Sequence, residues 1–263
     1  MSLSWSAKRK LFYFSIVFGA IVVALVILIY PYFNKEPTCF DKKMNGSESG
    51  IDCGGTCEKV CTQEALQLVT LWTAPFEVTP GKYNVMAYIE NQNRESGIPA
   101  INYEFKLYDA ENIFIGRTSG TTFITSNDRT AIFAPGVETG NRIPARATFQ
   151  FTSFPTWLKI SRDQRNALAV SAEDQLLSNP FDHPKLEAMI VNKTLTEMKN
   201  LEVFAILYDE NDNVMNVSKT LIDVLPKNSK APVVFTWPKP FAKRPTKIDI
   251  FPQVNVFELK IVK

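Results

Sequence analysis

All four cysteines of this chain lie in one short segment, at positions Cys39, Cys53, Cys57 and Cys61. An even number of closely spaced cysteines predicts two disulfides in an exported protein, with three pairings open. The C-x3-C-x3-C run could instead hold zinc or an iron–sulfur cluster, but such sites generally use C-x2-C pairs. Because the segment is too short to bury a core of its own, we expect the crosslinks to order it.

Oxygen-bearing side chains recur every three or four residues between these cysteines, at Asp41, Asn45, Glu48 and Asp52, among glycines. Hard oxygen ligands in a tight loop suit calcium. The same residue types form turns in any polar loop, which is the alternative interpretation. The sequence therefore predicts calcium as the one candidate cofactor, with these four residues as its ligands.

The segment resembles a short cysteine motif, C-x-D-x-x-x-N-x-x-E-x-x-x-D-C-G-G-x-C, found in secreted and surface proteins of bacteria, including single-pass envelope proteins. The residues from Asp41 to Cys57 match it, but Lys42 stands where the family usually has glycine. The resemblance implies a location outside the cytoplasm and no particular activity.

Catalytic chemistry has little support. The sole histidine, His183, follows Asp182, and neighbours along a strand would point to opposite faces. The chain has no G-x-S-x-G, H-E-x-x-H or phosphate-binding glycine motif. We expect a surface histidine, packing roles for the tyrosines and tryptophans, and no enzyme activity. The tyrosines and tryptophans considered are Tyr108, Tyr208, Trp72, Trp157 and Trp237.

An uninterrupted apolar run, Leu11–Tyr30, follows the basic triplet Lys8-Arg9-Lys10. A helix of this length spans about 30 Å, the thickness of the hydrocarbon core of a bilayer. The triplet favours a cytoplasmic N-terminus. We therefore predict a cytoplasmic stub (1–10), a transmembrane helix that contacts the lipid bilayer (11–33) and an extracytoplasmic cysteine-rich neck (34–64). A cleavable signal usually has a shorter apolar core and a small-x-small site, and a buried core helix is the other alternative.

The composition of the remaining chain favours β-structure and argues against nucleic-acid binding. The whole chain has a formal net charge of +2, and the N-terminal triplet accounts for more than that. A nearly neutral exported region lacks the basic face that a polyanion partner demands. Its content of Phe, Val, Ile and Thr is typical of strands.

Three short patterns then recur in the same order about one hundred residues later, which predicts a duplicated unit. They are Pro-Phe-acid (at Pro75 and Pro180), a strand ending in Asn (Asn91 and Asn192) and Leu-Tyr-Asp (ending at Asp109 and Asp209). We predict an all-β fold with two tandem antiparallel sandwiches, 66–162 and 165–263. In the first copy Tyr83, Val85, Ala87 and Ile89 would share one face of a half-buried strand, and the other face, which includes Met86 and Tyr88, is the more polar one. The strand Val203–Tyr208 is more continuously apolar and would lie centrally.

Both copies resemble the FxLYD-type domain, an immunoglobulin-like sandwich. Phe105–Asp109 matches that name in full, whereas the second copy has Ala205 at the first position. The resemblance implies an extracytoplasmic binding or scaffolding module without catalytic residues. Relative to the second copy, the first is expected to carry an insert over residues 113–141, which would be the natural contact surface.

The sequence thus predicts a membrane-anchored extracytoplasmic protein of the cell envelope that binds or scaffolds an envelope protein or a surface ligand. The alternative is an accessory or assembly component of a secretion, pilus or cell-wall machinery. A calcium-responsive neck is a third hypothesis.

Overall fold

The computed structural model describes residues 5–33, 37–126 and 128–259. The chain forms two compact units, Met1–Thr56 and Cys57–Lys263. The residues predicted as one neck, 34–64, are therefore divided between the two units after Thr56.

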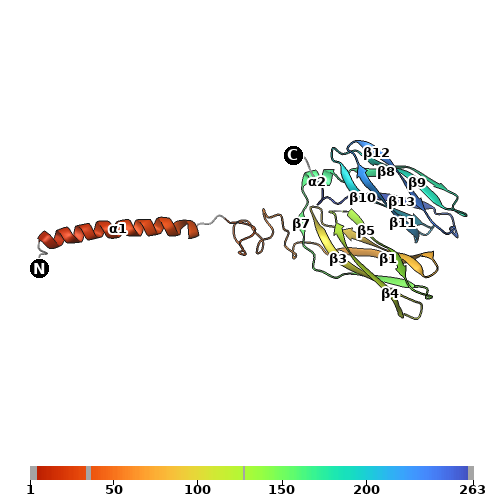
Figure 1. Ribbon diagram of the computed structural model, residues 1–263, viewed down its shortest axis with the longest axis horizontal. Helices are drawn as coiled ribbons and strands as arrows, with labels where there is room; N and C mark the ends of the chain where they lie inside the picture. Colours follow the sequence, from red (N-terminus) through yellow and green to blue (C-terminus); the bar gives the residue numbers. More distant parts are fainter. Residues whose placement is uncertain (1–4, 34–36, 127, 260–263) are drawn as a thin grey trace. The chain divides into compact units, whose positions relative to one another are not determined.

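The first unit contains helix α1 (Trp5–Phe33), which begins before the predicted span and includes the basic triplet (Figure 1). Its apolar window, Arg9–Tyr30, is long enough to cross a membrane, and no residue of that window is buried. A helix that belonged to the core of its own unit would bury one face, so the exposed window does not favour the core-helix alternative. The length and the apolar composition of this window fit both a membrane span and a signal sequence.

The second unit is all-β, and the predicted fold class is confirmed. Its first sandwich pairs the sheet β1-β2-β5 with the sheet β4-β3-β6, and β7 also pairs with β3. Its strands are β1 (Val69–Thr79), β2 (Lys82–Asn91), β3 (Ser96–Tyr108), β4 (Phe114–Ile124), β5 (Asp128–Glu138), β6 (Arg146–Phe151) and β7 (Leu158–Lys159). The side chains between the sheets form one apolar core that includes Val85, Ile89, Phe105, Leu107 and Trp157.

Helix α2 (Arg162–Asn166) leads to the second sandwich, in which the sheets are β12-β9-β8 and β11-β10-β13. Its strands are β8 (Val170–Ser178), β9 (Lys185–Asn192), β10 (Met198–Tyr208), β11 (Val214–Leu225), β12 (Ser229–Thr236) and β13 (Lys247–Gln253). The strand order repeats that of the first sandwich, so the predicted duplication is present in the fold.

Two of the three recurring sequence patterns mark equivalent positions. Asn91 and Asn192 end β2 and β9, and both side chains are buried. The Asn91 amide donates to the carbonyl oxygens of Ser96 and Thr125 at 2.9 and 2.6 Å, and that of Asn192 donates to Thr196 at 2.9 Å. Each asparagine thus satisfies loop carbonyls at one end of its sandwich, which explains why this residue type recurs.

The Pro-Phe-acid pattern does not mark equivalent positions, and the expected insert over 113–141 is absent. Pro75 lies within β1, whereas Pro180 lies in the turn between β8 and β9.

The expected insert is absent because strands β4 and β5 of the first sandwich correspond in order to β11 and β12 of the second. The run Phe114–Ile124, which is rich in Thr and Gly, is strand β4 rather than a loop. A Cβ at Gly120 would meet the Tyr103 side chain at 2.7–3.1 Å, so glycine leaves room for that side chain.

The two sandwiches are fused through a third apolar cluster that draws side chains from both. It lies between the outer face of the sheet β1-β2-β5 and the outer face of the sheet β11-β10-β13. Its buried members are Phe76, Met86, Tyr88 and Ala131 from the first sandwich and Phe204, Ile206, Tyr208 and Val217 from the second.

Ring contacts and polar contacts cross this interface. The ring centroids of Tyr88 and Phe251 lie 5.6 Å apart, and those of Phe133 and Phe204 lie 6.5 Å apart. The Ala131 N–H donates to Gln253 Oε1 at 2.8 Å. Aromatic pairs at these separations stabilise beyond the area that they bury, and the two sandwiches belong to one compact unit.

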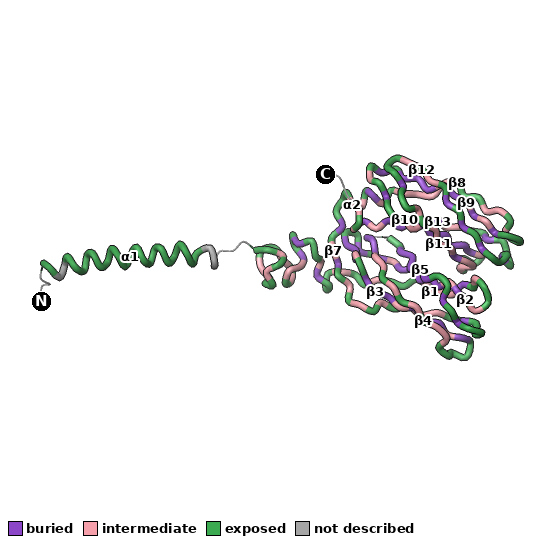
Figure 2. The backbone as a smooth tube through the Cα atoms, in the orientation of Figure 1, coloured by how far each residue is buried: buried purple, intermediate pink, exposed green. Residues whose placement is uncertain are grey.

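The interface overturns one expectation for β2. The face opposite the core of the first sandwich was predicted to be the more polar face of a half-buried strand, yet Met86 and Tyr88 are 0 and 8% exposed. Figure 2 colours the backbone by burial and shows buried residues among the strands of the second unit, whereas α1 is exposed. The second sandwich covers Met86 and Tyr88, which the two-residue period of a strand cannot reveal. The central position predicted for Val203–Tyr208 is confirmed, because each of these residues is buried.

The segment after Cys57 is attached to the first sandwich. The Val60 N–H donates to the Trp157 carbonyl at 2.9 Å, and the Lys159 N–H donates to the Glu58 carbonyl at 2.8 Å. Further along, the Asn93 side chain exchanges two hydrogen bonds of 2.8 Å with the backbone of Leu66. These bonds extend the sheet edge at β7 and tie the chain to one end of the sandwich.

Equivalent positions on β10 and β3 allow a matched test of the interface. Phe204 is buried between the sandwiches, whereas its counterpart Glu104 lies on the open face of the first sandwich, bonded to Lys106 and Gln150. We expect Phe204→Ala to lower the free energy of unfolding by about 3–5 kcal/mol and Glu104→Ala to change it by less than about 0.5 kcal/mol. Urea unfolding of the full chain in detergent micelles measures both, and equal losses would contradict the fused arrangement.

Candidate functional site

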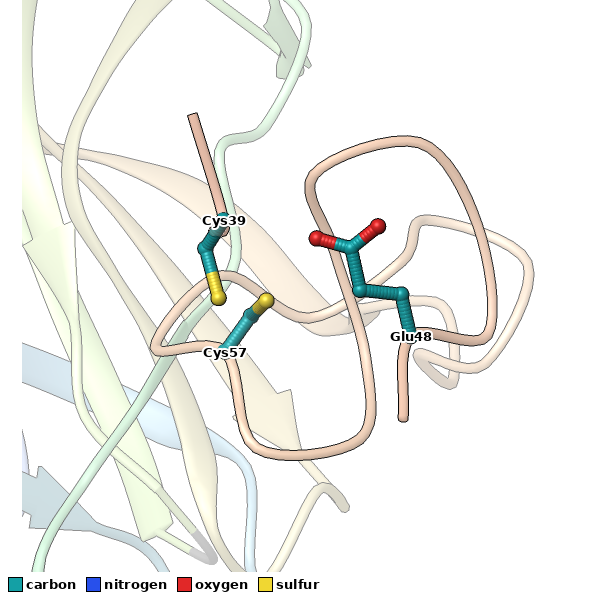
Figure 3. A group of neighbouring side chains, drawn as sticks. All are labelled: Cys39, Glu48 and Cys57. Carbon is teal, nitrogen blue, oxygen red and sulfur yellow. The ribbon is translucent and has the colours of Figure 1, made fainter. Parts of the chain in front are cut away.

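All four cysteines are disulfide-bonded. Figure 3 shows the side chains of Cys39, Glu48 and Cys57, three residue types that can ligate a metal. Because both sulfurs are oxidised, neither is the thiolate that zinc or an iron–sulfur cluster requires. These cysteines therefore hold the chain together and do not form a thiolate metal centre.

The structure gathers the four predicted calcium ligands into one hydrogen-bonded loop. Asp41 Oδ2 accepts from the Asn45 amide at 2.7 Å, and Glu48 Oε2 accepts from the Asn45 N–H at 3.1 Å. Both carboxylate oxygens of Asp52 accept from the Lys42 N–H, at 3.0 and 3.1 Å. The hydrogen bond from Asn45 is the main reason that the pKa of Asp41 is lowered, so this carboxyl is ionised at neutral pH.

Backbone geometry explains the glycines of this loop. Gly55 has φ +53°, and a Cβ there would lie 1.7 Å from the Ser47 carbonyl oxygen. The loop thus closes on itself through turns and backbone donors, as the turn-former alternative expects. One acceptor departs from that pattern: Asn45 Oδ1 is excluded from solvent and has no hydrogen-bond partner among the described residues. Calcium binding by this loop remains a prediction.

The sole histidine lies in the turn between β8 and β9, so the argument from strand geometry does not apply to it. His183 Nδ1 lies 2.9 Å from Asp182 Oδ1, and both side chains are largely exposed. A surface histidine was predicted, and its exposed position agrees with that. Trp157 and Trp237 are buried core residues, whereas Trp72 packs beside the inter-sandwich cluster.

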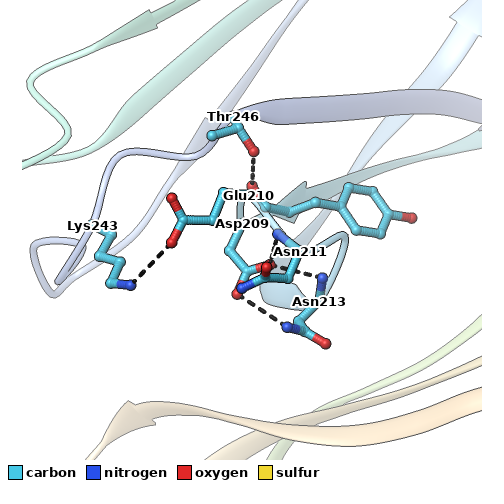
Figure 4. A network of polar contacts seen from close by, with 7 residues as sticks. Asp209, Glu210, Asn211, Asn213, Lys243 and Thr246 are labelled. Carbon is cyan, nitrogen blue, oxygen red and sulfur yellow. Dashed lines mark hydrogen bonds and ion pairs between the residues drawn. The ribbon is translucent and has the colours of Figure 1, made fainter.

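The aspartate of the Leu-Tyr-Asp pattern caps the same turn in both copies. Asp209 Oδ1 accepts from the backbone N–H groups of Asn211 and Asn213, each at 2.9 Å (Figure 4). The bond from Asn213 is the largest cause of the lowered pKa of Asp209. In the first copy Asp109 Oδ1 accepts from the Ile113 N–H at 2.8 Å. The Leu-Tyr-Asp pattern is therefore explained by a buried leucine, a packed tyrosine and a turn-capping aspartate.

The turns themselves differ between the copies. In the first, three apolar side chains are exposed, Ile113 (47%), Phe114 (51%) and Ile143 (75%). We call them the tip patch. The corresponding residues of the second copy are Asn213, Val214 and Arg244. The fold therefore does not require apolar residues at the positions of Ile113 and Ile143, whereas the position of Phe114 is apolar in both copies. Contiguous exposed apolar patches are typical of interaction sites.

The backbone beneath the tip patch is held firmly. Arg142 forms an ion pair with Asp109, and Arg146 Nε donates to Asn112 Oδ1 at 3.0 Å. The Arg146 guanidinium also lies 4.2 Å from the centroid of the Tyr108 ring. These contacts join the β3–β4 turn to the β5–β6 loop and pre-organise the patch.

The tip patch overlaps the region 113–141, which the sequence analysis singled out as a contact surface; that contact surface remains a prediction. The region 113–141 was singled out as an insert, whereas Ile113 and Phe114 begin β4 and Ile143 lies just beyond. A strand-by-strand alignment of the two copies would have found the patch, because it sets Ile113 opposite Asn213.

Comparison with known proteins does not assign the chain to a family. No family model and no curated protein sequence matches it. Among solved structures, the chain is weakly similar to the N-terminal tandem domain CBM22-1–CBM22-2 of Xyn10C from Paenibacillus barcinonensis. The two share 8% identity over 74% of this chain and 88% of that one, with a TM-score of 0.15. A similarity of that size supports no inference about fold or function.

The loop 41–52 gives a direct test of the calcium prediction. If calcium binds through these oxygens, millimolar calcium should raise the midpoint of thermal unfolding of the full chain by mass action, and Asp41→Asn should abolish the rise. Magnesium serves as the control ion, because it demands a tighter octahedral site. If calcium did not change the midpoint of the unaltered protein, the calcium prediction would be wrong and only the turn-former interpretation would remain.

Proposed function

We propose that this protein is anchored in a membrane by α1 and presents its fused sandwiches outside the cytoplasm as a non-catalytic binding or scaffolding protein of the cell envelope. Three features support the anchor and its orientation. The helix is apolar and long enough to span a bilayer, basic residues precede the span, and the cysteines beyond it are oxidised.

The tip patch is the observation that carries the binding role. Strand β3 runs for 13 residues, from the end tied to the segment after Cys57 to the turn that bears the patch. At the rise of an extended strand, the patch lies about 40 Å from that attachment. Loops held on a rigid sandwich are where recognition usually occurs.

The composition of the patch fits a protein partner. An exposed phenylalanine and two isoleucines lie beside the half-exposed Arg142. Aromatic and arginine side chains are enriched among the residues that dominate protein–protein binding energy. The alternative is an accessory or assembly component of a secretion, pilus or cell-wall machinery, in which α1 would make contacts as well as the tip patch. We include in this proposal that both sandwiches are FxLYD-type binding or scaffolding modules, as their resemblance to that domain implies.

The orientation can be tested with the cysteines. After mild reduction of intact cells, a membrane-impermeant thiol reagent should label the segment Cys39–Cys61, because this segment lies outside the membrane in the proposed topology. Mass mapping of the labelled peptides gives the answer. Labelling that required permeabilised cells would reverse the topology.

The binding surface can be tested by site-specific photo-crosslinking in native membranes. A photoreactive phenylalanine analogue at Phe114 should give a discrete adduct, which mass spectrometry identifies. The double variant I113N/I143R, which installs the residues of the second copy and so keeps the turn, should reduce that adduct by about ten-fold, as expected for the loss of binding hot spots.

An analogue at Leu176, an equally exposed apolar side chain on β8 of the second sandwich, is the matched control and should not give the adduct. If the Phe114 adduct persisted undiminished in I113N/I143R, the tip patch would not be the binding surface.

A further inference from the structure

Strand β4 lies at one edge of the sheet β4-β3-β6 (Figure 1). Among the strands of the described residues, β4 pairs with β3 alone. Its register with β3 is regular from Gly116 to Thr122, between two register shifts near the ends of the strand. We call this run the β4 edge. Every second residue of an edge strand directs its backbone N–H and C=O away from the neighbouring strand, so the β4 edge presents a row of groups that no described strand pairs.

The β4 edge lacks the features that protect the other sheet edges of this protein. Natural sheets guard an edge strand with proline, a bulge, charges or a short length. Proline lies in β1, β5, β12 and β13, β8 has a register shift, and β6 has only 6 residues. Strand β11, the counterpart of β4, carries Lys219 and Asp223. The β4 edge has no proline and one charge, Arg117, and an edge of this kind is a template for another strand.

The residues of the β4 edge leave room for such a strand. Besides Arg117 they are glycine, serine and threonine. The residues on the core side of the β4 edge are only partly buried, whereas those opposite them on β3 are buried. The core of the first sandwich is therefore incompletely covered along β4, and an added strand would cover it.

The sequence of the β4 edge complements itself about its central residue. If two such runs pair antiparallel about Ser119, Arg117 of one copy lies opposite Thr121 of the other, and Thr118 lies opposite Gly120. The two arginines are then four residues apart along the strands, about 13 Å. The only charge of the run thus faces a small polar side chain rather than a like charge, which would destabilise the pair.

We infer that this chain forms a two-fold dimer in which the β4 edges of two copies pair antiparallel about Ser119, so that their sheets β4-β3-β6 become one continuous sheet. An edge pairing of this length is a small interface, typical of weak and transient complexes. The tip patch lies outside the paired run. The dimer therefore goes beyond the proposed function, and neither depends on the other.

A Ser119→Cys variant tests the pairing. Residues directly opposite each other in an antiparallel pair have Cα atoms about 4.5–5.5 Å apart, which is within the range that a disulfide spans. Mild oxidation of the full chain in detergent micelles should therefore give a disulfide-linked dimer, seen by non-reducing electrophoresis. The unaltered chain is the control and should give none, because its four cysteines are already disulfide-bonded.

Matched cysteines on the same strand test the register. Residues 117, 119 and 121 are all exposed, but only residue 119 lies opposite itself. Arg117→Cys and Thr121→Cys each place the two new sulfurs about 13 Å apart in the dimer, so each should give at most about a tenth of the Ser119→Cys yield. The double variant R117C/T121C sets a cysteine opposite a cysteine and should restore the yield.

Charge substitutions test the dimer without a crosslink. Thr121→Arg sets an arginine opposite Arg117 twice in each dimer and should weaken dimerisation by about five- to ten-fold in sedimentation equilibrium, because like charges directly opposite repel. The variant T121R/R117E replaces each repulsion by an opposite-charge pair and should restore dimerisation. The thermal midpoint of each variant shows whether the sandwich itself stays folded.

Three outcomes would overturn the inference. The first is the absence of a disulfide-linked dimer of Ser119→Cys, and the second is an equal yield from the three single-cysteine variants. The third is a dimer that forms undiminished in folded Thr121→Arg, because such a dimer would use another surface.

Discussion

The aromatic interface between the sandwiches is the constraint on which the rest of the second unit depends. It buries Tyr88 and Ile206 on faces that a single sandwich would leave open to water, so β2 and β10 are covered on both sides. Burial of apolar surface is the dominant favourable term in folding, and here it joins two sandwiches that would otherwise share only a short linker. The tip patch lies at one end of the first sandwich, within the same compact unit.

Duplication followed by divergence explains how one fold serves different surfaces. At the same position of equivalent strands, Phe204 is buried in the interface and Glu104 is paired with Lys106 on an open face. A polar outer face on a terminal unit limits further stacking, as in other repeat proteins. At the turns the difference is reversed: the first copy has the apolar and exposed Ile113 where the second copy has the polar Asn213. Positions that neither packing nor turn geometry restricts are free to acquire binding functions.

The cysteine segment solves a different problem. A stretch this short cannot bury enough apolar area to pay the entropy of ordering. Disulfides restrict its unfolded states, and carboxylates such as Asp52 accept from backbone N–H groups to satisfy its turns. Cys57 and Cys61 are buried in the second unit, so part of the predicted neck belongs to the domain that it precedes.

Much of this protein can be predicted from sequence because the signals are local. Apolar continuity identifies α1, alternation identifies strands such as β2, and the recurring Asn91 and Asp109 patterns reveal the duplication through residues that satisfy nearby backbone groups. Turn-forming residues likewise mark the loop 41–52. The tertiary structure alone decided that the two sandwiches are fused and that residues 113–141 are not an insert. Those outcomes depend on which outer face of one sheet meets another. A strand's two-residue period determines which residues share a face, but it carries no information about what will cover that face.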